Sequence, residues 1–107
     1  MIEIFLDDVR EPPRGFFGVI CRTARSAIHL LSTGLVSYIS FDHDLGTDLT
    51  GYDVAAYIEE SVYTGSIPCP QYAIHSANPV GSERIHAAMT SAQRLQSERI
   101  QNETKRV

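Results

Sequence analysis

The sequence predicts an α/β fold in which helices cover an open parallel sheet. Short, β-prone apolar segments alternate with segments whose apolar residues recur at helical spacing, and capping residues mark the starts of those helices. Alternation of this kind favours a parallel sheet with right-handed crossovers. The length of 107 residues suits one domain. We therefore expect four strands and three helices, with a loop in place of the first crossover helix.

The first two strands are joined by a loop. Residues 1–6 (MIEIFL) are predicted to form the first strand, and a second strand is expected within residues 16–22. Pro12 and Pro13 lie between them and exclude a helix interior there, because proline lacks a backbone N–H and clashes with the preceding turn. The first crossover is therefore predicted to lack a helix.

The first helix and the third strand follow. Thr23 is a suitable N-cap, apolar residues then recur at helical spacing, and Gly34 is expected to stop this helix. Residues 36–42 (VSYISFD) are predicted to form the third strand. The segment 43–50 is rich in Asp, Gly and Thr and reads as a loop.

The second half of the chain repeats this alternation. Thr50 and Asp53 have the spacing of a capping box, so a second helix is expected to begin near Gly51. A turn at 65–70 and a fourth strand at 71–75 follow.

The last helix is predicted from its first two residues. Asn78 supplies an N-cap, and Pro79 suits the first helical position because its missing N–H would be unpaired there. We expect one domain over residues 1–96, with 97–107 as a polar tail that continues the last helix or frays from it.

Composition narrows the possible partners. The net charge of −4 gives no global basic field, so binding to duplex nucleic acid or to an anionic membrane is not expected. The sequence contains no signal-peptide pattern and no apolar run near the roughly 20 residues that span a bilayer, which predicts a cytoplasmic protein. Cys21 and Cys69 are predicted to be free thiols rather than a disulfide or metal ligands.

Acidic residues follow two of the predicted strands. Asp7 and Asp8 end the first strand, and Asp42 ends the third. The carboxyl ends of parallel strands share one edge of the sheet, and ligands bind there at the point where strand order reverses. With the strand order 2-1-3-4, that point lies between the first and third strands, so these three carboxylates would flank it.

Clustered carboxylates repel one another, and a divalent cation would neutralise them. An all-oxygen site suits Mg²⁺, whereas Mn²⁺ or Ca²⁺ would be hard to exclude, and His43 and His75 leave room for a transition metal. Each acidic segment taken alone could equally be an ordinary polar turn.

The segment IHSANP (residues 74–79) provides candidate phosphate ligands. The start of the last helix offers backbone N–H groups to an anion, and the hydroxyl of Ser76 could bind the same group. Arg10 or Arg22 could add a bidentate contact to phosphate. The simpler alternatives are that Asn78 is only an N-cap, that His75 is a core histidine and that the arginines are surface residues.

The segments LDDVR, FDHDLG, TGYDVAAYIE and IHSANPVG together resemble the cyclic-phosphate-processing receiver-like domains, a divergent branch of the response-regulator receivers. The resemblance spans residues 4 to about 90 and is carried by the ordered set of segments. It implies a bacterial or phage protein with a flavodoxin-like, three-layer fold. In this chain the sheet is expected to have four parallel strands in the order 2-1-3-4, with the first crossover helix and the fifth strand reduced or absent.

The resemblance also implies roles for particular residues. Asp7 and Asp8 match the paired metal-binding acids of receivers, and Asp42 matches the acid that accepts a phosphoryl group. The backbone carbonyl of Asp44 matches a further metal ligand, and Ser76 matches the receiver Ser/Thr after the fourth strand.

Two departures from receivers point away from phosphorelay signalling. Receivers carry a lysine after a fifth strand, but the only lysine here is Lys105. His43 and His75 are additional, and imidazoles that titrate near pH 6.5 suit general acid and base chemistry.

These features predict a phosphoesterase that uses Mg²⁺ or Mn²⁺ and acts on a cyclic phosphate of a nucleotide or of an RNA end. Asp7, Asp8, Asp42 and Asp44 are the expected metal ligands. The expected proton-transfer residues are His43 and His75, and the expected phosphate ligands are Arg10, Ser76 and Asn78. Two alternatives remain: a non-catalytic module that binds a phosphorylated ligand or a protein partner, and an atypical receiver phosphorylated on Asp42.

Overall fold

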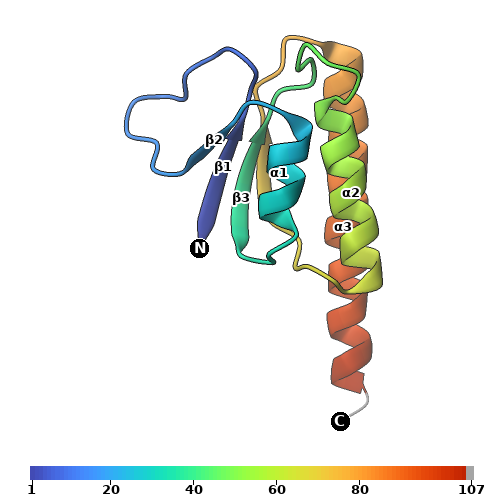
Figure 1. The fold of residues 1–107 in the computed structure, drawn as a ribbon. Coiled ribbons are helices and arrows are strands. Elements are labelled where there is room, and N and C mark those ends of the chain that lie inside the picture. The colour runs from blue at the N-terminus through green and yellow to red at the C-terminus, as the bar shows by residue number, and fades with distance from the viewer. Residues whose placement is uncertain (106–107) are drawn as a thin grey trace.

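The computed structural model describes residues 1–105 and shows a four-stranded parallel sheet with three helices (Figure 1). The elements are β1 (Ile2–Leu6), β2 (Val19–Cys21), α1 (Ala24–Leu31), β3 (Val36–Phe41), α2 (Gly51–Thr64), β4 (Gln71–Ile74) and α3 (Pro79–Lys105). The strand order is β2-β1-β3-β4. The receiver-like α/β prediction is therefore confirmed, including the order 2-1-3-4 and the loop in place of the first crossover helix.

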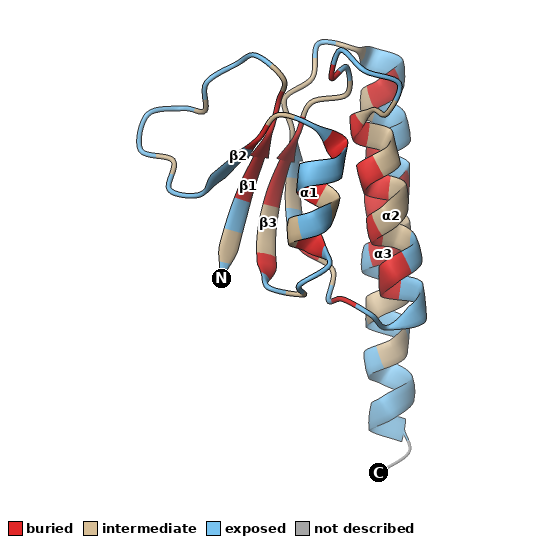
Figure 2. Cartoon of the chain, viewed as in Figure 1, coloured by how far each residue is buried: buried red, intermediate tan, exposed pale blue. Residues whose placement is uncertain are grey.

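The hydrophobic core lies on one face of this sheet. Side chains alternate along the strands, so Ile4 and Leu6 of β1 point to the same face as Ile39 and Phe41 of β3. Residues from all three helices complete the same buried cluster (Figure 2). Both helical crossovers, β2-α1-β3 and β3-α2-β4, move in the same direction across the sheet. Right-handed crossovers then place their helices on the same face.

The opposite face carries no helix among the described residues. The loop between β1 and β2 lies beside it (Figure 1). Phe16 of that loop packs edge-on against Phe5, with ring centroids 6.0 Å apart. The first crossover helix and a fifth strand are absent from residues 1–105, as predicted. The third layer that the resemblance implied therefore consists of this loop, without a helix.

The three predicted N-caps are all present. The hydroxyl of Thr23 accepts a 3.2 Å hydrogen bond from the N–H of Ser26 at the start of α1. The carboxylate of Asp53 accepts a 2.7 Å bond from the backbone N–H of Thr50, the reciprocal half of the capping box. The side-chain carbonyl of Asn78 accepts a 2.9 Å bond from the N–H of Gly81. Each cap satisfies a backbone donor that lacks a partner within the helix.

Helix α3 continues past the rest of the domain to Lys105 (Figure 1). The side-chain oxygen of Gln96 accepts a 2.6 Å bond from the N–H of Cys69. The predicted polar segment 97–107 is thus helical as far as it is described, and its last two residues lie outside the described part. No helix within residues 1–105 is long and apolar enough to cross a membrane. Cys21 and Cys69 are free thiols, as predicted.

Candidate functional site

The pairing of β1 with β3 brings the candidate metal ligands together. Leu6 and Phe41 are register partners at the ends of these strands, so Asp7 and Asp42 follow side by side. The N–H of Asp42 donates a 2.9 Å bond to the carbonyl of Leu6, which extends the ladder by one residue. One carboxylate oxygen from each of Asp7, Asp8 and Asp42 lies within 4.8 Å of the other two.

Asp7 is completely buried, and every hydrogen bond to its carboxylate favours the charged form. One oxygen accepts bonds from the N–H groups of Val9 (2.9 Å) and Arg10 (2.8 Å), and the other lies 3.0 Å from Nε2 of His75. Burial alone would raise the pKa of Asp7, but the two backbone bonds and His75 outweigh it and hold the pKa below its ordinary value.

His75 is held on three sides. Its Nδ1 lies 2.7 Å from the hydroxyl of Ser40, and its ring stacks on Phe5 with centroids 4.4 Å apart. An ionised carboxylate only accepts hydrogen bonds, so the proton of a neutral His75 lies on Nε2, facing Asp7, and Ser40 donates to Nδ1. Ser40 is 8% exposed and is not among the predicted site residues. Its position one strand residue before Phe41, on the face away from the core, was the available signal.

The surroundings of Asp42 disfavour the charged form of its carboxylate. Its carboxylate accepts a 2.8 Å bond from the N–H of His43, but burial and then the charge of Asp7 raise its pKa. The repulsion between these groups falls when a cation lies between them. Three hard oxygen donors at this spacing suit Mg²⁺ or Mn²⁺, so the residues present fit the predicted metal.

His43 lies under the start of α3. Its Nδ1 is 2.9 Å from a carboxylate oxygen of Asp44, and a side chain at Gly81 would overlap the His43 ring. Its Nε2 is buried and has no hydrogen-bond partner within residues 1–105. One ring nitrogen of His43 is thus engaged by the protein and the other is not.

The Asp44 side chain belongs to this second group rather than to the three carboxylates. Its oxygens lie 3.3 and 3.4 Å from the side-chain nitrogen of Asn78, and its hydrogen bond with His43 lowers its pKa. The prediction for Asp44 as a metal ligand concerned its backbone carbonyl, and these side-chain contacts do not test it.

The three expected phosphate ligands lie at the same edge of the sheet but differ in their free donors. Ser76 accepts a 3.0 Å bond from the N–H of Asn78, which leaves its hydroxyl hydrogen available. Both ends of the Asn78 amide are engaged, with Gly81 on one side and with His43 and Asp44 on the other. Arg10 donates from Nη1 to the carbonyl of His75 at 3.1 Å, which holds its guanidinium beside the site.

Arg22 supports the loop after β1. It donates to the carbonyls of Asp7 (3.2 Å) and Arg10 (2.6 Å) and forms a 2.8 Å ion pair with Glu11. Through these contacts Arg22 holds in place the loop that carries Asp7 and Asp8.

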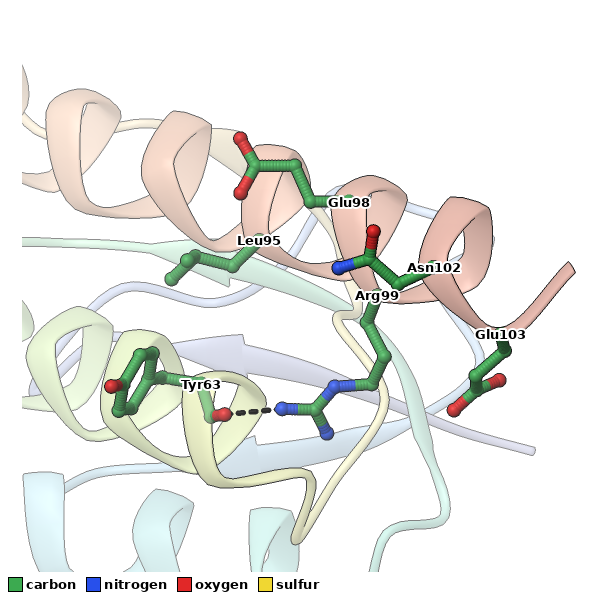
Figure 3. A pocket seen from close by; sticks show the side chains of 6 residues that line it. All are labelled: Tyr63, Leu95, Glu98, Arg99, Asn102 and Glu103. Atoms are coloured by element: carbon green, nitrogen blue, oxygen red, sulfur yellow. Dashed lines mark hydrogen bonds between the residues drawn. The ribbon is translucent and has the colours of Figure 1, made fainter. Parts of the chain in front are cut away.

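Two surface pockets lie away from the edge of the sheet that carries the predicted site residues. One, of about 420 Å³, lies between the end of α2 and the last turns of α3, where Arg99 reaches the backbone carbonyl of Tyr63 (Figure 3). Another, of about 430 Å³, lies at the amino ends of the strands, beside Met1 and Val36. Neither is lined by a predicted site residue.

The sheet order, the acids after β1 and β3, and the serine after β4 define a receiver-like domain. The chain belongs to the cyclic-phosphate processing receiver domain family, whose model matches residues 2–91. No curated protein and no solved structure matches the chain. The protein is thus a receiver domain of a family associated with cyclic-phosphate processing.

Proposed function

We propose that this domain is a metal-dependent phosphoesterase that opens a cyclic phosphate. In this reaction one P–O ester bond breaks, the elements of water are added, and a phosphomonoester with a free hydroxyl forms. The observation that carries the proposal is the group of three carboxylates within 4.8 Å of one another, on a domain whose family is associated with cyclic phosphates. The substrate class would be a cyclic nucleotide or an RNA end with a cyclic phosphate.

The chain's own residues divide into holding and proton-transfer roles. Asp7, Asp8 and Asp42 would hold Mg²⁺ or Mn²⁺, and the Asp44 carbonyl remains a candidate further ligand. The ion would supply positive charge that polarises a phosphoryl oxygen. Arg10 and the Ser76 hydroxyl have donors for the phosphate, whereas the engaged amide of Asn78 fits a role in positioning the helix start.

The two histidines differ in what their contacts allow. Both ring nitrogens of His75 are engaged, by Ser40 and Asp7, which suits a residue that positions Asp7. Nε2 of His43 has no protein partner within residues 1–105, which leaves it free to exchange a proton with the leaving oxygen of a bound substrate. We therefore assign the proton-transfer step to His43 and the positioning role to His75.

The test is turnover of 2′,3′- and 3′,5′-cyclic nucleotides by the purified protein with Mg²⁺ or Mn²⁺. We expect a phosphomonoester product, loss of turnover in Asp42→Asn, and a reduction of about 10²-fold or more in His43→Gln. Glu103→Gln, on the distal part of α3, is the matched control and should retain activity. Absence of turnover of both isomer classes with either metal would reject the proposal.

A second candidate is a module that binds a phosphorylated ligand without turnover. The observation that favours it is the burial of Nε2 of His43, which leaves that nitrogen without direct access to water. Calorimetry with 2′,3′-cyclic nucleotides and with nucleoside 2′- and 3′-monophosphates separates the two functions. Tight binding of both cyclic and open phosphates, with the cyclic ligand recovered intact, would favour the binding module.

The third candidate, a signalling receiver phosphorylated on Asp42, has less support. Lys105 is the last residue of α3, and this end of α3 lies at the opposite end of the domain from the carboxyl ends of the strands (Figure 1). Incubation with acetyl phosphate followed by intact mass measurement tests this function, and a phosphoryl adduct lost in Asp42→Asn would support it.

A further inference from the structure

We propose that a pocket between α1 and the loop after β3 is a nucleobase subsite that prefers guanine. The pocket has a volume of about 130 Å³ and is lined by Thr23, Ala24, Arg25, Thr47, Asp48 and Leu49. The inference deepens the proposed function, on which it rests, by naming the part of a cyclic nucleotide that would give specificity.

Both walls of the pocket begin directly after residues that lie against the candidate metal ligands. On one wall, Thr47 follows Gly46, where a Cβ atom would lie 3.2 Å from a carboxylate oxygen of Asp8. On the other wall, Thr23 follows Arg22, whose guanidinium donates to the carbonyl of Asp7 at 3.2 Å. The backbone N–H of Asp7 also donates to the carbonyl of Cys21 at 3.1 Å, two residues before Thr23, so both walls leave the sheet beside the acidic site.

Both walls come from the end of the sheet where ligands bind in this kind of fold. Thr23 caps α1 directly after β2, and residues 47–49 lie in the loop that leaves the carboxyl end of β3 (Figure 1). A ligand that enters the crevice at the strand-order reversal, between β1 and β3, would meet this pocket on the helix-covered side.

The lining combines apolar contact with two charged groups that have no partner in the described structure. Leu49 is half-buried and can contact a flat ring, whereas Ala24 is 1% exposed and forms part of the pocket floor. Arg25 and Asp48 are exposed and form no ion pair or side-chain hydrogen bond within residues 1–105. Arg25 therefore offers a fork of donors, and Asp48 offers two acceptor oxygens.

Guanine is the base whose edges match both groups. Its N1–H and N2–H are adjacent donors that one carboxylate can accept, and its O6 and N7 are adjacent acceptors for a guanidinium. Adenine, cytosine and uracil do not present two adjacent donors to a carboxylate. The matching pairs on Asp48 and Arg25 therefore favour guanine over the other bases.

The size of the pocket fits a base rather than a whole nucleotide. Sites that enclose a complete small ligand are typically about 300–1,000 Å³, larger than this pocket of about 130 Å³. The ribose and phosphate of a bound nucleotide would then lie outside the pocket, toward Asp7 and Asp8.

The test measures binding separately from turnover. Calorimetry with Mg²⁺ and the four nucleoside 3′-monophosphates should show 3′-GMP binding at least tenfold more tightly than the others. Asp48→Asn and Arg25→Gln should each remove most of that preference, while Glu103→Gln should retain it. Circular dichroism would verify that each variant is folded. Equal affinity for the four bases, or a guanine preference that survives both substitutions, would overturn the subsite.

Steady-state kinetics distinguishes this result from the fate of the phosphoesterase proposal. Guanine-selective binding without hydrolysis of any cyclic nucleotide would reject the enzyme and support the subsite. Hydrolysis of all four 2′,3′-cyclic nucleotides with equal kcat/KM would support the enzyme and overturn the subsite.

Discussion

Asp7 and Asp42 are neighbouring carboxylates whose pKa values shift in opposite directions. Burial would raise the pKa of Asp7, but hydrogen bonds from Arg10, Val9 and His75 lower it overall; burial and the charge of Asp7 raise the pKa of Asp42. Asp7 therefore contributes stability that is present above pH 3.8 and is lost as the pH falls through its lower folded pKa. Asp42 does the opposite, because its charged form is disfavoured by folding. The site keeps this charge at a cost to stability, which is typical of groups retained for a ligand.

The first prediction follows from Asp42. Asp42→Asn should stabilise the metal-free protein at pH 7, because the amide carries no charge that burial disfavours or that Asp7 repels. The gain should be small near pH 3, grow as the pH rises through 3.8, and become constant above the folded pKa of Asp42. Urea unfolding of both proteins between pH 3 and 7, with metal chelated, measures this difference. A gain that does not change with pH would contradict the electrostatic explanation.

The second prediction concerns metal binding to the same variant. A cation that binds only the folded wild-type protein stabilises it by about 2.7 kcal/mol at a concentration 100 times its dissociation constant. Thermal unfolding with added Mg²⁺ or Mn²⁺ should therefore raise the Tm of the wild-type protein and leave that of Asp42→Asn nearly unchanged. Equal shifts in both proteins would place the cation elsewhere.

The third prediction concerns Ser40. Ser40→Ala removes the donor to His75, which should cost about 1–3 kcal/mol because a part-buried ring nitrogen loses its partner. Metal affinity should fall about 10-fold or more, because His75 orients Asp7. Nitrogen-15 NMR should show the Nε2–H tautomer of His75 in the wild-type protein and a mixture of tautomers in the variant.

Ser37→Ala is the matched control for this measurement. Ser37 lies on the same strand, and its hydroxyl makes only a long 3.4 Å contact with the carbonyl of Ile2. Its removal should change stability by no more than about 0.5 kcal/mol and leave the His75 tautomer unaltered. Equal effects at the two serines would contradict a specific role for Ser40.

At the level of elements, features that depend on neighbouring residues could be predicted from the sequence, whereas contacts between distant elements could not. The caps at Thr23, Thr50 and Asn78 were predictable because their partners lie within three residues. The contact between Gly81 and the ring of His43 was not, because it joins the loop after β3 to the start of α3 across 38 positions. No pattern in the sequence alone indicates that Gly81 is required by a side chain so far away in the chain.

The fourth prediction tests that contact. Replacing a helical glycine by alanine usually stabilises a protein by about 0.5–1 kcal/mol. Adding a methyl group to a space that is already filled destabilises it by about 1–3 kcal/mol. Gly81→Ala should therefore destabilise the protein, because its Cβ would overlap His43. In a His43→Ala background the same change should become stabilising. Urea unfolding of the four proteins closes the double-mutant cycle, and additive effects would show that the two residues are not coupled.

At the scale of the whole molecule, the fold places an acidic site at one end of a sheet with helices on one face. The alternation of strands and helices predicted the parallel sheet, and family resemblance supplied its order. Which donors are free and which are engaged could not be predicted, because the Ser40–His75–Asp7 contacts join three separate strand ends. The anchoring of the last turns of α3 was also unpredictable, since polar composition is compatible with either a helix or a frayed tail.

The last prediction addresses that part of α3. Arg99 donates to the carbonyl of Tyr63 at the end of α2, and its guanidinium occupies the space beside Gly65. A chain ending at Gln96 keeps the bond from Cys69 to Gln96 but loses Arg99, so it should fold with a loss of about 1–2 kcal/mol. Arg99→Ala should reproduce most of this loss, whereas Arg94→Ala, which removes only an exposed 3.7 Å ion pair, should cost less than about 0.5 kcal/mol. The metal-dependent rise in Tm should persist in all three variants, because the carboxylates lie at the other end of the domain. Loss of that rise in the shortened chain alone would show that the end of α3 supports the site as well as the fold.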